Sequence, residues 1–93
     1  MIISFADKET EKIFSGQYST KLPYSMQKSA LRKLVMMDNV TSAEELRFIP
    51  GNHLEILRGD RKGQYSIRIN SKYRICFASV DNYFVNVEIV DYH

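Results

Sequence analysis

Apolar and polar side chains alternate along most of the chain after residue 64, and this alternation restricts the possible folds more than any other feature. In "QYSIRIN", Tyr65, Ile67 and Ile69 alternate with polar residues, and "YRICFAS" and "YFVNVEIV" continue with the same period. A period of two places neighbouring side chains on opposite faces of a β-strand. Turn-forming residues separate the runs at positions 70–72 and 81–82. We therefore expect three consecutive antiparallel strands joined by tight turns.

The chain before residue 50 has a helical pattern instead. Asp7 is a suitable N-cap for a short first helix, which Ser15 and Gly16 would end. A second, longer helix would have Pro23 as its first residue, because apolar residues recur around and after it at helical spacing: Leu22, Met26, Ala30, Leu34 and Met37.

Two further segments complete the expected fold. Ser42 and Glu45 match a capping box for a brief third helical turn, which Pro50 and Gly51 would end. The apolar run "IISF" near the N-terminus predicts a short edge strand. The sequence therefore predicts an α+β fold, with an N-terminal strand and two helices packed on one face of a mainly antiparallel sheet formed by the C-terminal half.

The length and composition of the chain predict a single domain. Its 93 residues suffice for one hydrophobic core and leave no room for a second. The single cysteine, Cys76, excludes an internal disulfide framework and a CxxC metal knuckle. No signal-peptide pattern and no apolar run of roughly 18 residues is visible. We therefore expect a cytoplasmic protein that does not span a membrane.

Basic residues concentrate in one part of the chain, although the net charge is only +2. A local basic patch is typical of a protein with a polyanionic partner. The same block is also compatible with an ordinary solvated surface, which is the more frequent reason for clustered charges. Between positions 58 and 74 the only acidic residue is Asp60, and the basic residues are Arg58, Arg61, Lys62, Arg68, Lys72 and Arg74.

The alternation also places two arginines on the sheet face opposite the helices. If the aliphatic rows face the helices, Arg68 and Arg74 lie on the other face, together with Asn86 and Glu88 of the last strand. In one interpretation both arginines form surface ion pairs with Glu88, which contribute about 0–1 kcal/mol each. In the other they bind an anionic substrate. The pattern alone leaves both interpretations open.

Four segments of the chain together span nearly its whole length: "IISFADKETEKIF", "PGNHLEIL", "RGDRKGQYSIRINSKYRICF" and the final "DYH". In this order they resemble the HigB-type toxins of the RelE superfamily, which belong to bacterial type II toxin–antitoxin systems. The resemblance implies a compact RelE-like toxin domain over residues 1–93. It also implies a ribosome-dependent endoribonuclease, an mRNA interferase that cleaves mRNA in the decoding site without a metal ion or any other cofactor.

The same resemblance implies the partners of the protein. The substrate would be mRNA on the ribosome. A cognate HigA-like helix-turn-helix antitoxin would neutralise the toxin, and operator DNA would be contacted only indirectly, through that antitoxin. None of these partners is visible in the residues themselves, whereas the fold and an anionic substrate are.

The chain offers one type of group for each step of metal-free RNA cleavage, which needs a base for the 2′-hydroxyl, positive charge at the phosphate and an acid for the leaving 5′-oxygen. By similarity to the family, Asp91, Tyr92 and His93 would form the acid–base cluster, with either Asp91 or His93 as the base. Arg74 would stabilise the transition state, with Arg68 as a supporting cation. The remaining candidates would bind RNA or the ribosome: Arg58, Arg61, Lys62, Lys72 and His53.

His53 and Glu55 depart from the pattern of the family. Many relatives have a histidine at the position of Glu55, whereas the histidine of this chain lies two residues earlier. Two residues along a strand correspond to roughly 6–7 Å on the same face. Glu55 would therefore serve as a base or pair with Arg58, and His53 would share the cleft or remain a surface loop residue.

Two rival functions remain open. A non-catalytic module of the same fold would bind RNA or the ribosome through its basic block, and a purely regulatory protein would act only as the antitoxin's partner in repression. Two other patterns carry little weight. The adhesion tripeptide "RGD" lacks an export signal, and the possible metal ligands lack close spacing: His53, Glu55, Asp91 and His93.

Overall fold

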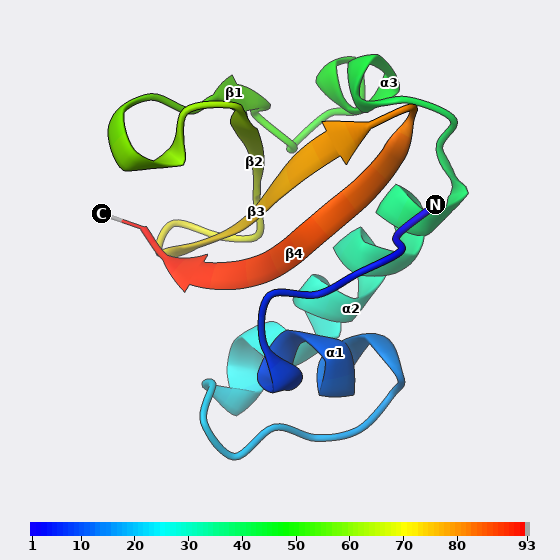
Figure 1. Cartoon of the computed structure of the whole chain (residues 1–93). Coiled ribbons are helices and arrows are strands. Elements are labelled where there is room, and N and C mark those ends of the chain that lie inside the picture. Colours follow the sequence, from blue (N-terminus) through cyan, green and yellow to red (C-terminus); the bar gives the residue numbers. More distant parts are fainter. Residues whose placement is uncertain (93) are drawn as a thin grey trace.

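The computed structural model describes residues 1–92, in which three α-helices precede a four-stranded sheet (Figure 1). The helices are α1 (Lys8–Phe14), α2 (Tyr24–Asn39) and α3 (Ala43–Arg47). The strands are β1 (Glu55–Ile56), β2 (Gln64–Arg68), β3 (Tyr73–Val80) and β4 (Tyr83–Asp91), and a 3₁₀ turn, η1 (Gly59–Arg61), links β1 to β2. No helix of this described part is long and apolar enough to cross a membrane.

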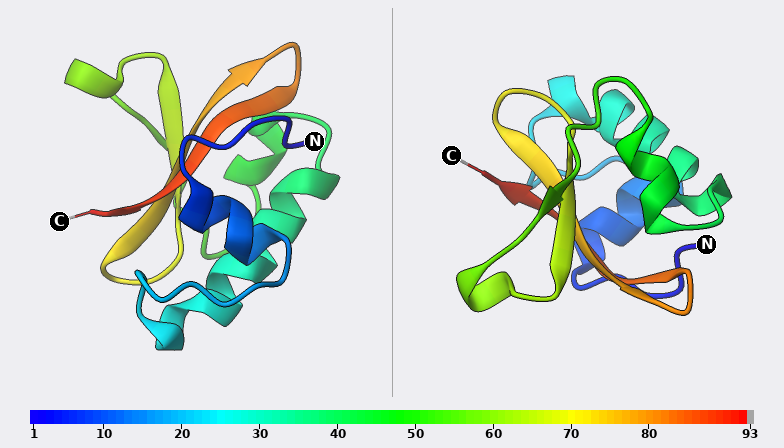
Figure 2. Two further views of the ribbon diagram at one scale, coloured as in Figure 1. Left: turned by 60° about the horizontal axis from the view of Figure 1, so that its bottom comes forward. Right: turned by 90° about the horizontal axis from the view of Figure 1, so that it is seen from above.

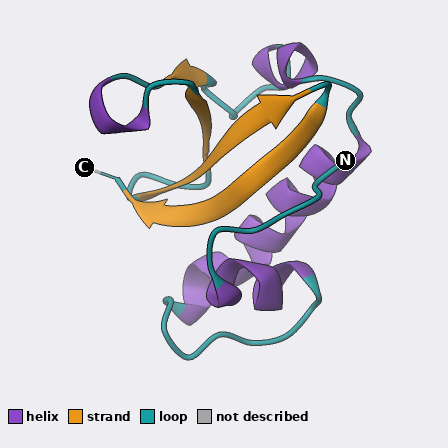
Figure 3. Cartoon of the chain, in the orientation of Figure 1, coloured by secondary structure: helices purple, strands orange, loops and turns teal. Residues whose placement is uncertain are grey.

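The sheet has the strand order β1-β2-β3-β4, and each neighbouring pair is antiparallel (Figure 3). The three strands that the alternating pattern predicts are therefore confirmed as β2, β3 and β4. The pattern does not predict β1, because two residues are too few to show a period. This strand depends on β2 for its partners, with Glu55 opposite Ser66 and Ile56 opposite Tyr65.

The turn between β2 and β3 forms at the predicted position. The side-chain oxygen of Asn70 accepts the N–H groups of Lys72 and Tyr73, each at 2.8 Å. This local bonding by an asparagine side chain is the reason that such residues favour turns. It brings the basic residue Lys72 to the tip of the hairpin, beside the end of β4.

The segment before α1 lies along the outer edge of β4, as the edge-strand prediction requires. Ile2 and Phe5 form isolated parallel bridges with Phe84 and Val87. The segment therefore pairs with β4 in parallel at two points and does not form a continuous strand. The helices α1 and α2 pack on one face of the sheet (Figure 2), so the predicted α+β fold is confirmed.

The ends of the first two helices agree closely with the sequence predictions. Asp7 caps α1, and its carboxylate accepts the N–H of Thr10 at 3.2 Å. Gly16 follows the end of α1 with a φ of 87°, a left-handed conformation that favours glycine. Pro23 directly precedes α2, so the predicted first residue is one position early.

The predicted capping box of α3 does not form, although Ser42 does precede the helix. Ser42 occupies the N-cap position, but its side chain makes no cap hydrogen bond. Glu45 instead accepts the N–H of Thr41 at 3.1 Å and is also hydrogen-bonded by the Thr41 hydroxyl. These bonds lower the pKa of Glu45, the hydroxyl contributing most. The glutamate reaches one residue further back than a capping box requires, because Thr41 offers two donors at once.

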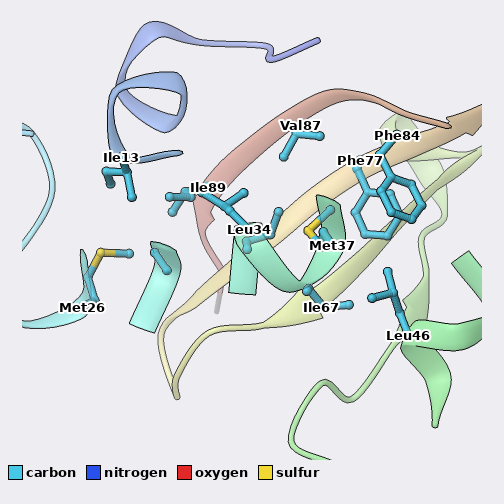
Figure 4. Close-up of a cluster of buried hydrophobic side chains, with 12 residues drawn as sticks. Ile13, Met26, Leu34, Met37, Leu46, Ile67, Phe77, Phe84, Val87 and Ile89 are labelled. Carbon is cyan, nitrogen blue, oxygen red and sulfur yellow. The ribbon is translucent and has the colours of Figure 1, made fainter. Parts of the chain in front are cut away.

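The hydrophobic core lies between the helices and the inner face of the sheet (Figure 4). The apolar rows of the predicted strands point into it, and Ile67, Ile75 and Phe77 are fully buried. Phe77 and Phe84 meet edge to face, with ring centroids 4.9 Å apart. The second helix contributes its predicted apolar stripe, so the inward-facing residues of α2 are Met26, Ala30, Leu34 and Met37.

A β-bulge interrupts the strict alternation that the sequence predicts for β4. Phe84 and Val87 are both fully buried although they are three residues apart. The register with β3 shifts between Cys76 and Ala78, and Asn86 has a φ of 54°. The extra residue lets Phe84 and Val87 enter the same core, and it leaves Asn86 exposed while Glu88 remains on the outer face.

Candidate active site on the outer sheet face

The sheet face opposite α1 and α2 carries most of the residues that the sequence singled out. In both views of Figure 2, η1 and the end of β4 project from the side of the sheet that faces away from these helices. The outward residues of β2, β3 and β4 include Ser66, Arg74 and Glu88, and β1 adds Glu55 at the edge. These side chains form the candidate site.

Arg74 is the central cation of this face and is almost completely buried, with 7% of its surface exposed. Its Nε donates to the hydroxyl of Ser66 at 2.7 Å, and its Nη2 donates to the Ser66 carbonyl at 3.2 Å and to the His53 carbonyl. Its Nη1 forms an ion pair with Glu55 at 3.2 Å. The guanidinium is therefore held in one orientation from several sides.

The hydrogen bonds of Arg74 show which part of the guanidinium can meet a ligand. A guanidinium has five N–H donors, one on Nε and two on each terminal nitrogen. Nε and Nη2 are used by Ser66 and His53, whereas the only partner of Nη1 within residues 1–92 is Glu55, with which it forms the ion pair. Since the side chain of Glu55 is 48% exposed, a phosphate can compete with it for Nη1.

Tyr92 follows β4 and lies against Arg74. The guanidinium carbon of Arg74 is 5.6 Å from the centroid of the Tyr92 ring, a distance typical of a cation–π contact. The Tyr92 N–H donates to the carbonyl of Lys72 at 2.7 Å, so β4 keeps its pairing up to this residue. The structure thus brings two of the predicted catalytic residues together, Arg74 and Tyr92.

Asp91 lies beside the β2–β3 hairpin. Its carboxylate is 3.6 Å from the ammonium group of Lys72, and it pairs across the sheet with Tyr73. The predicted binding residue Lys72 therefore contacts a predicted catalytic residue. The third member of the acid–base cluster, His93, lies outside the described residues.

Glu88 pairs with Arg61 of η1, with 2.8 Å between the charged atoms. This ion pair raises the pKa of Arg61. The interpretation in which Glu88 forms ion pairs with Arg68 and Arg74 is therefore wrong, because Glu88 pairs with Arg61 instead. The error arises because η1 folds back over the sheet, a long-range arrangement that the alternation within the strands does not show.

Cys76 forms part of the floor of the site, on the same strand face as Arg74. It is fully buried, and burial raises the pKa of its thiol. The thiol therefore remains protonated at neutral pH, and its environment does not activate it as a nucleophile. Cys76 therefore fills space in the outer sheet face.

His53 and Glu55 approach the site in different ways. His53 is exposed and has a φ of 44°, and it contributes its backbone carbonyl to Arg74. Glu55 contributes its carboxylate to Arg74, so its predicted pairing with Arg58 is not the one observed. The loop thus supplies an acceptor to Arg74 through the backbone of His53.

Asn52 holds this loop in place, and sequence reasoning missed it. The residue is fully buried; its side chain accepts from Lys33 at 2.6 Å and donates to the Leu46 carbonyl at 3.0 Å. Its own carbonyl accepts the N–H of Arg68 at 2.7 Å. An asparagine after Pro50-Gly51 resembles an ordinary turn residue, so the sequence contains no signal for this role.

Three predicted cations remain available to an anion. Within residues 1–92 no hydrogen bond or ion pair engages the side chains of Arg58, Lys62 or Arg68. Arg68 lies opposite Arg74 in the sheet register, and the other two flank η1. Their charges can therefore attract a phosphate backbone without first breaking an internal contact.

A surface depression in the described part of the chain lies away from this face. A depression of about 180 Å³ lies on the helical layer, between the end of α1 and α2, and is lined by Ile13, Tyr18, Tyr24 and Leu31 among others. It contains none of the predicted site residues. Within residues 1–92 no three His, Cys, Asp or Glu side chains are grouped so that they could hold a metal ion.

Similar proteins are found among families and curated sequences. The family model of the RelE-like toxin of type II toxin–antitoxin system HigB matches residues 3–93. The chain is 37% identical over 87 residues to Toxin HigB-1 of Vibrio cholerae, and these residues cover 92% of each of the two proteins. It is 36% identical over 78 residues to an uncharacterized protein of Haemophilus influenzae, covering 84% of this chain and 76% of the relative.

Solved structures show the same fold. The YoeB-YefM complex from Staphylococcus aureus matches with a TM-score of 0.63 and 25% identity, over 100% of this chain and 95% of that chain. The YoeB dimer from the same organism matches with a TM-score of 0.58 and 25% identity, over 99% and 94% of the two chains. Together with the match over residues 3–93, these findings show that the chain belongs to the HigB-like family of RelE-like toxins of type II toxin–antitoxin systems.

Proposed function

We propose that this toxin is an endoribonuclease that cleaves mRNA on the ribosome without a metal ion. The observation that carries the proposal is the position of Arg74, which is held rigidly beside Tyr92 and keeps Nη1 for a competing anion. A fixed cation in a buried setting stabilises developing negative charge more strongly than a mobile one in water. The outer sheet face therefore suits a phosphodiester substrate.

The reaction that fits these groups is an internal transfer. A base removes the proton of the 2′-hydroxyl, whose oxygen attacks the adjacent phosphorus. The bond from phosphorus to the 5′-oxygen breaks, and an acid donates a proton to that oxygen. The products are a 2′,3′-cyclic phosphate and a 5′-hydroxyl, and no water has to be activated by a metal ion.

The proposed roles follow from the positions of the groups. Arg74 stabilises the negative charge of the pentavalent phosphate, and Arg68 supports it from the neighbouring strand. The Tyr92 ring lies against the guanidinium of Arg74, and Asp91, the last residue of β4, directly precedes it. By similarity to the family, either Asp91 or His93 is the base; an unperturbed histidine titrates near pH 6.5 and can act in either direction.

The remaining basic residues would hold the RNA or the ribosome. Among the described residues, Arg58 and Lys62 have no ion-pair partner, and Lys72 lies at the tip of the β2–β3 hairpin, where it also contacts Asp91. Arg61 is engaged by Glu88, so its contribution to RNA binding would be mainly to the local potential. His53, exposed beside Arg74, would contact the same substrate.

An antitoxin partner belongs to the same proposal. One structural relative is solved as a YoeB-YefM complex, and by the family resemblance this toxin would likewise act together with an antitoxin, in the cytoplasm. That the partner of this chain is a HigA-like helix-turn-helix protein, through which operator DNA is contacted, rests on the family resemblance.

The proposal is tested with purified protein, ribosomes programmed with a defined mRNA, and the same mRNA free in solution. Cleavage of the ribosome-bound mRNA alone supports it. Binding to ribosomes without any cleavage would favour the non-catalytic module, and neither binding nor cleavage would favour a purely regulatory protein.

A matched pair of variants locates the activity on the sheet face. Tyr92→Ala should abolish cleavage with little change in stability, because Tyr92 is 38% exposed. Tyr24→Ala removes an exposed aromatic ring from α2 instead and should leave cleavage unchanged. Equal effects of the two changes would place the activity elsewhere.

A further inference from the structure

The outer edge of β4 changes its hydrogen-bonding partner midway along the strand. At first the N-terminal segment supplies the partner, and the Val87 N–H donates to the Ser4 carbonyl at 3.1 Å. The last bond of this segment runs from the Ala6 N–H to the Val87 carbonyl at 2.9 Å. The chain then turns into α1, whereas β4 continues to Asp91.

Thr10 of α1 takes over where the N-terminal segment leaves. Its Oγ1 accepts the N–H of Ile89, the second residue after Val87, at 2.9 Å. Thr10 is fully buried and Ile89 is 8% exposed, so water cannot replace this bond freely. Thr10 is itself fixed, because its N–H donates to the carboxylate of Asp7. One helical hydroxyl therefore acts as the outer partner of the strand.

The bulge makes this contact important for the direction of the strand end. Asn86 interrupts the regular pairing of β4 with β3 just before Val87. A bulge bends its strand and increases the local twist. The first half of β4 therefore does not determine where the second half points, and Ile89 is the first residue after Val87 that the helical layer holds by a hydrogen bond.

The other side of the strand end depends on the β2–β3 hairpin. Asp91 pairs with Tyr73, and the Tyr92 N–H donates to the carbonyl of Lys72. Lys72 belongs to an exposed turn. The bond between Thr10 and Ile89 is thus the buried anchor on the opposite edge of this segment.

We propose that Thr10 is a positioning residue that fixes the end of β4 and, with it, Asp91 and Tyr92. The inference rests on the proposed function, in which these residues act on RNA. Catalytic groups must be held to within about 0.5 Å of their productive positions. Loss of the Thr10 hydroxyl leaves the Ile89 N–H buried without an acceptor, and the strand end shifts to regain one.

The first test compares Thr10→Val, which keeps the shape but removes the hydroxyl, with Thr10→Ser, which keeps the hydroxyl. At a temperature where all variants are folded, Thr10→Val should lower the kcat for cleavage of ribosome-bound mRNA on the order of tenfold or more, with KM unchanged. Thr10→Ser should remain within about twofold of the wild type. Thr10→Ala serves as a second hydroxyl-free variant if the valine form does not fold.

The second test measures the position directly, by amide hydrogen exchange. In Thr10→Val the protection of the Tyr92 amide should fall, whereas the Phe84 amide, which precedes the bulge and bonds to the Met1 carbonyl, should keep its protection. Ile13→Val is the control, because it loosens the same helix in the core without touching β4 through a hydrogen bond. It should change neither kcat nor the exchange at Tyr92.

The outcomes separate this inference from the proposed function. If wild-type protein does not cleave ribosome-bound mRNA, the proposed function fails, and the exchange at Tyr92 still tests the positioning role. If Thr10→Val keeps both the wild-type kcat and the wild-type protection at Tyr92, or if Ile13→Val reproduces its effects, the positioning role is wrong.

Discussion

The guanidinium carbon of Arg74 lies 5.6 Å from the centroid of the Tyr92 ring. Arg74 comes from the middle of the sheet, where Ser66 and the His53 carbonyl hold it, whereas Tyr92 lies just beyond the last strand. The contact therefore joins a buried, fixed charge to a partly exposed hydroxyl-bearing ring.

Arg74→Lys should lower the single-turnover rate of mRNA cleavage on the order of 10²–10³-fold. A lysine keeps the charge, but it cannot reproduce the planar fork that donates to Ser66 and His53 together. Those acceptors then lose partners, so the free energy of unfolding should also fall by about 1–3 kcal/mol. Rates measured well below the melting temperature separate the two effects. A rate within a few-fold of the wild type would mean that charge alone is needed.

Lys62→Ala is the matched control among the cations. Lys62 is exposed and carries no internal ion pair in the described part of the chain, so its loss should leave the cleavage rate at saturation and the stability unchanged. It should weaken ribosome or RNA binding and make the dependence of log affinity on log salt shallower by about one unit or less. Equal effects of Lys62→Ala and Arg74→Lys on the saturated rate would indicate a diffuse basic patch without a privileged arginine.

The toxin should cleave ribosome-bound mRNA after treatment with a chelator selective for transition metals. The upstream fragment should end in a 2′,3′-cyclic phosphate and the downstream fragment in a 5′-hydroxyl, because the internal 2′-hydroxyl is the nucleophile. The chelator must spare magnesium, which the ribosome requires. Enzymatic end-labelling of the fragments distinguishes these termini from a 3′-hydroxyl, and a 3′-hydroxyl product would overturn the proposed chemistry.

The strands and their faces could be predicted because alternation is a local property of the chain. The inward positions of Ile67, Ile75 and Phe77 follow directly from it. The bulge could not be predicted, since Asn86 reads as an ordinary outward-facing polar residue. Its left-handed conformation becomes favourable only when Phe84 and Val87 must both enter one core.

The composition of the site was predictable, but several of its contacts were not. The pattern of β2 and β3 placed Arg74 on the outer face, where it is found. Its main partners are a backbone carbonyl and a serine, and the position of that carbonyl depends on the loop that Asn52 holds. The pairing of Glu88 with Arg61 likewise depends on how η1 folds back. Such contacts between distant segments have no periodic signal in the sequence.

Cys76 should react slowly with a thiol reagent in the folded protein. The residue is fully buried and burial raises its pKa, so the thiolate that reacts is scarce and inaccessible. Because the pKa of Cys76 is higher in the folded than in the unfolded protein, the unfolded state loses the thiol proton first as the pH rises. The contribution of this thiol to stability is therefore fully present below the unfolded pKa of about 9.0 and is lost as the pH rises through the folded pKa.

The reaction of Cys76 with a chromogenic disulfide at pH 8, with and without denaturant, measures this protection. Complete reaction on mixing should occur only in denaturant. The same speed in native buffer would show that the floor of the site opens readily, and a rigid setting for Arg74 could then not be maintained.

His93→Gln should abolish most of the mRNA cleavage while leaving thermal stability nearly unchanged. Glutamine retains much of the length and the hydrogen bonding of histidine but cannot transfer a proton, so the change isolates acid–base chemistry from binding. Asp91→Asn is the companion variant, because it removes the charge that faces Lys72 while keeping the shape of the side chain. The pH dependence of the cleavage rate then identifies the base: loss of the acidic limb in His93→Gln alone would assign this role to the imidazole. If both variants cleave mRNA and arrest growth like the wild type, neither Asp91 nor His93 has a catalytic role. The acid–base groups that act beside Arg74 and Tyr92 would then have to be other residues.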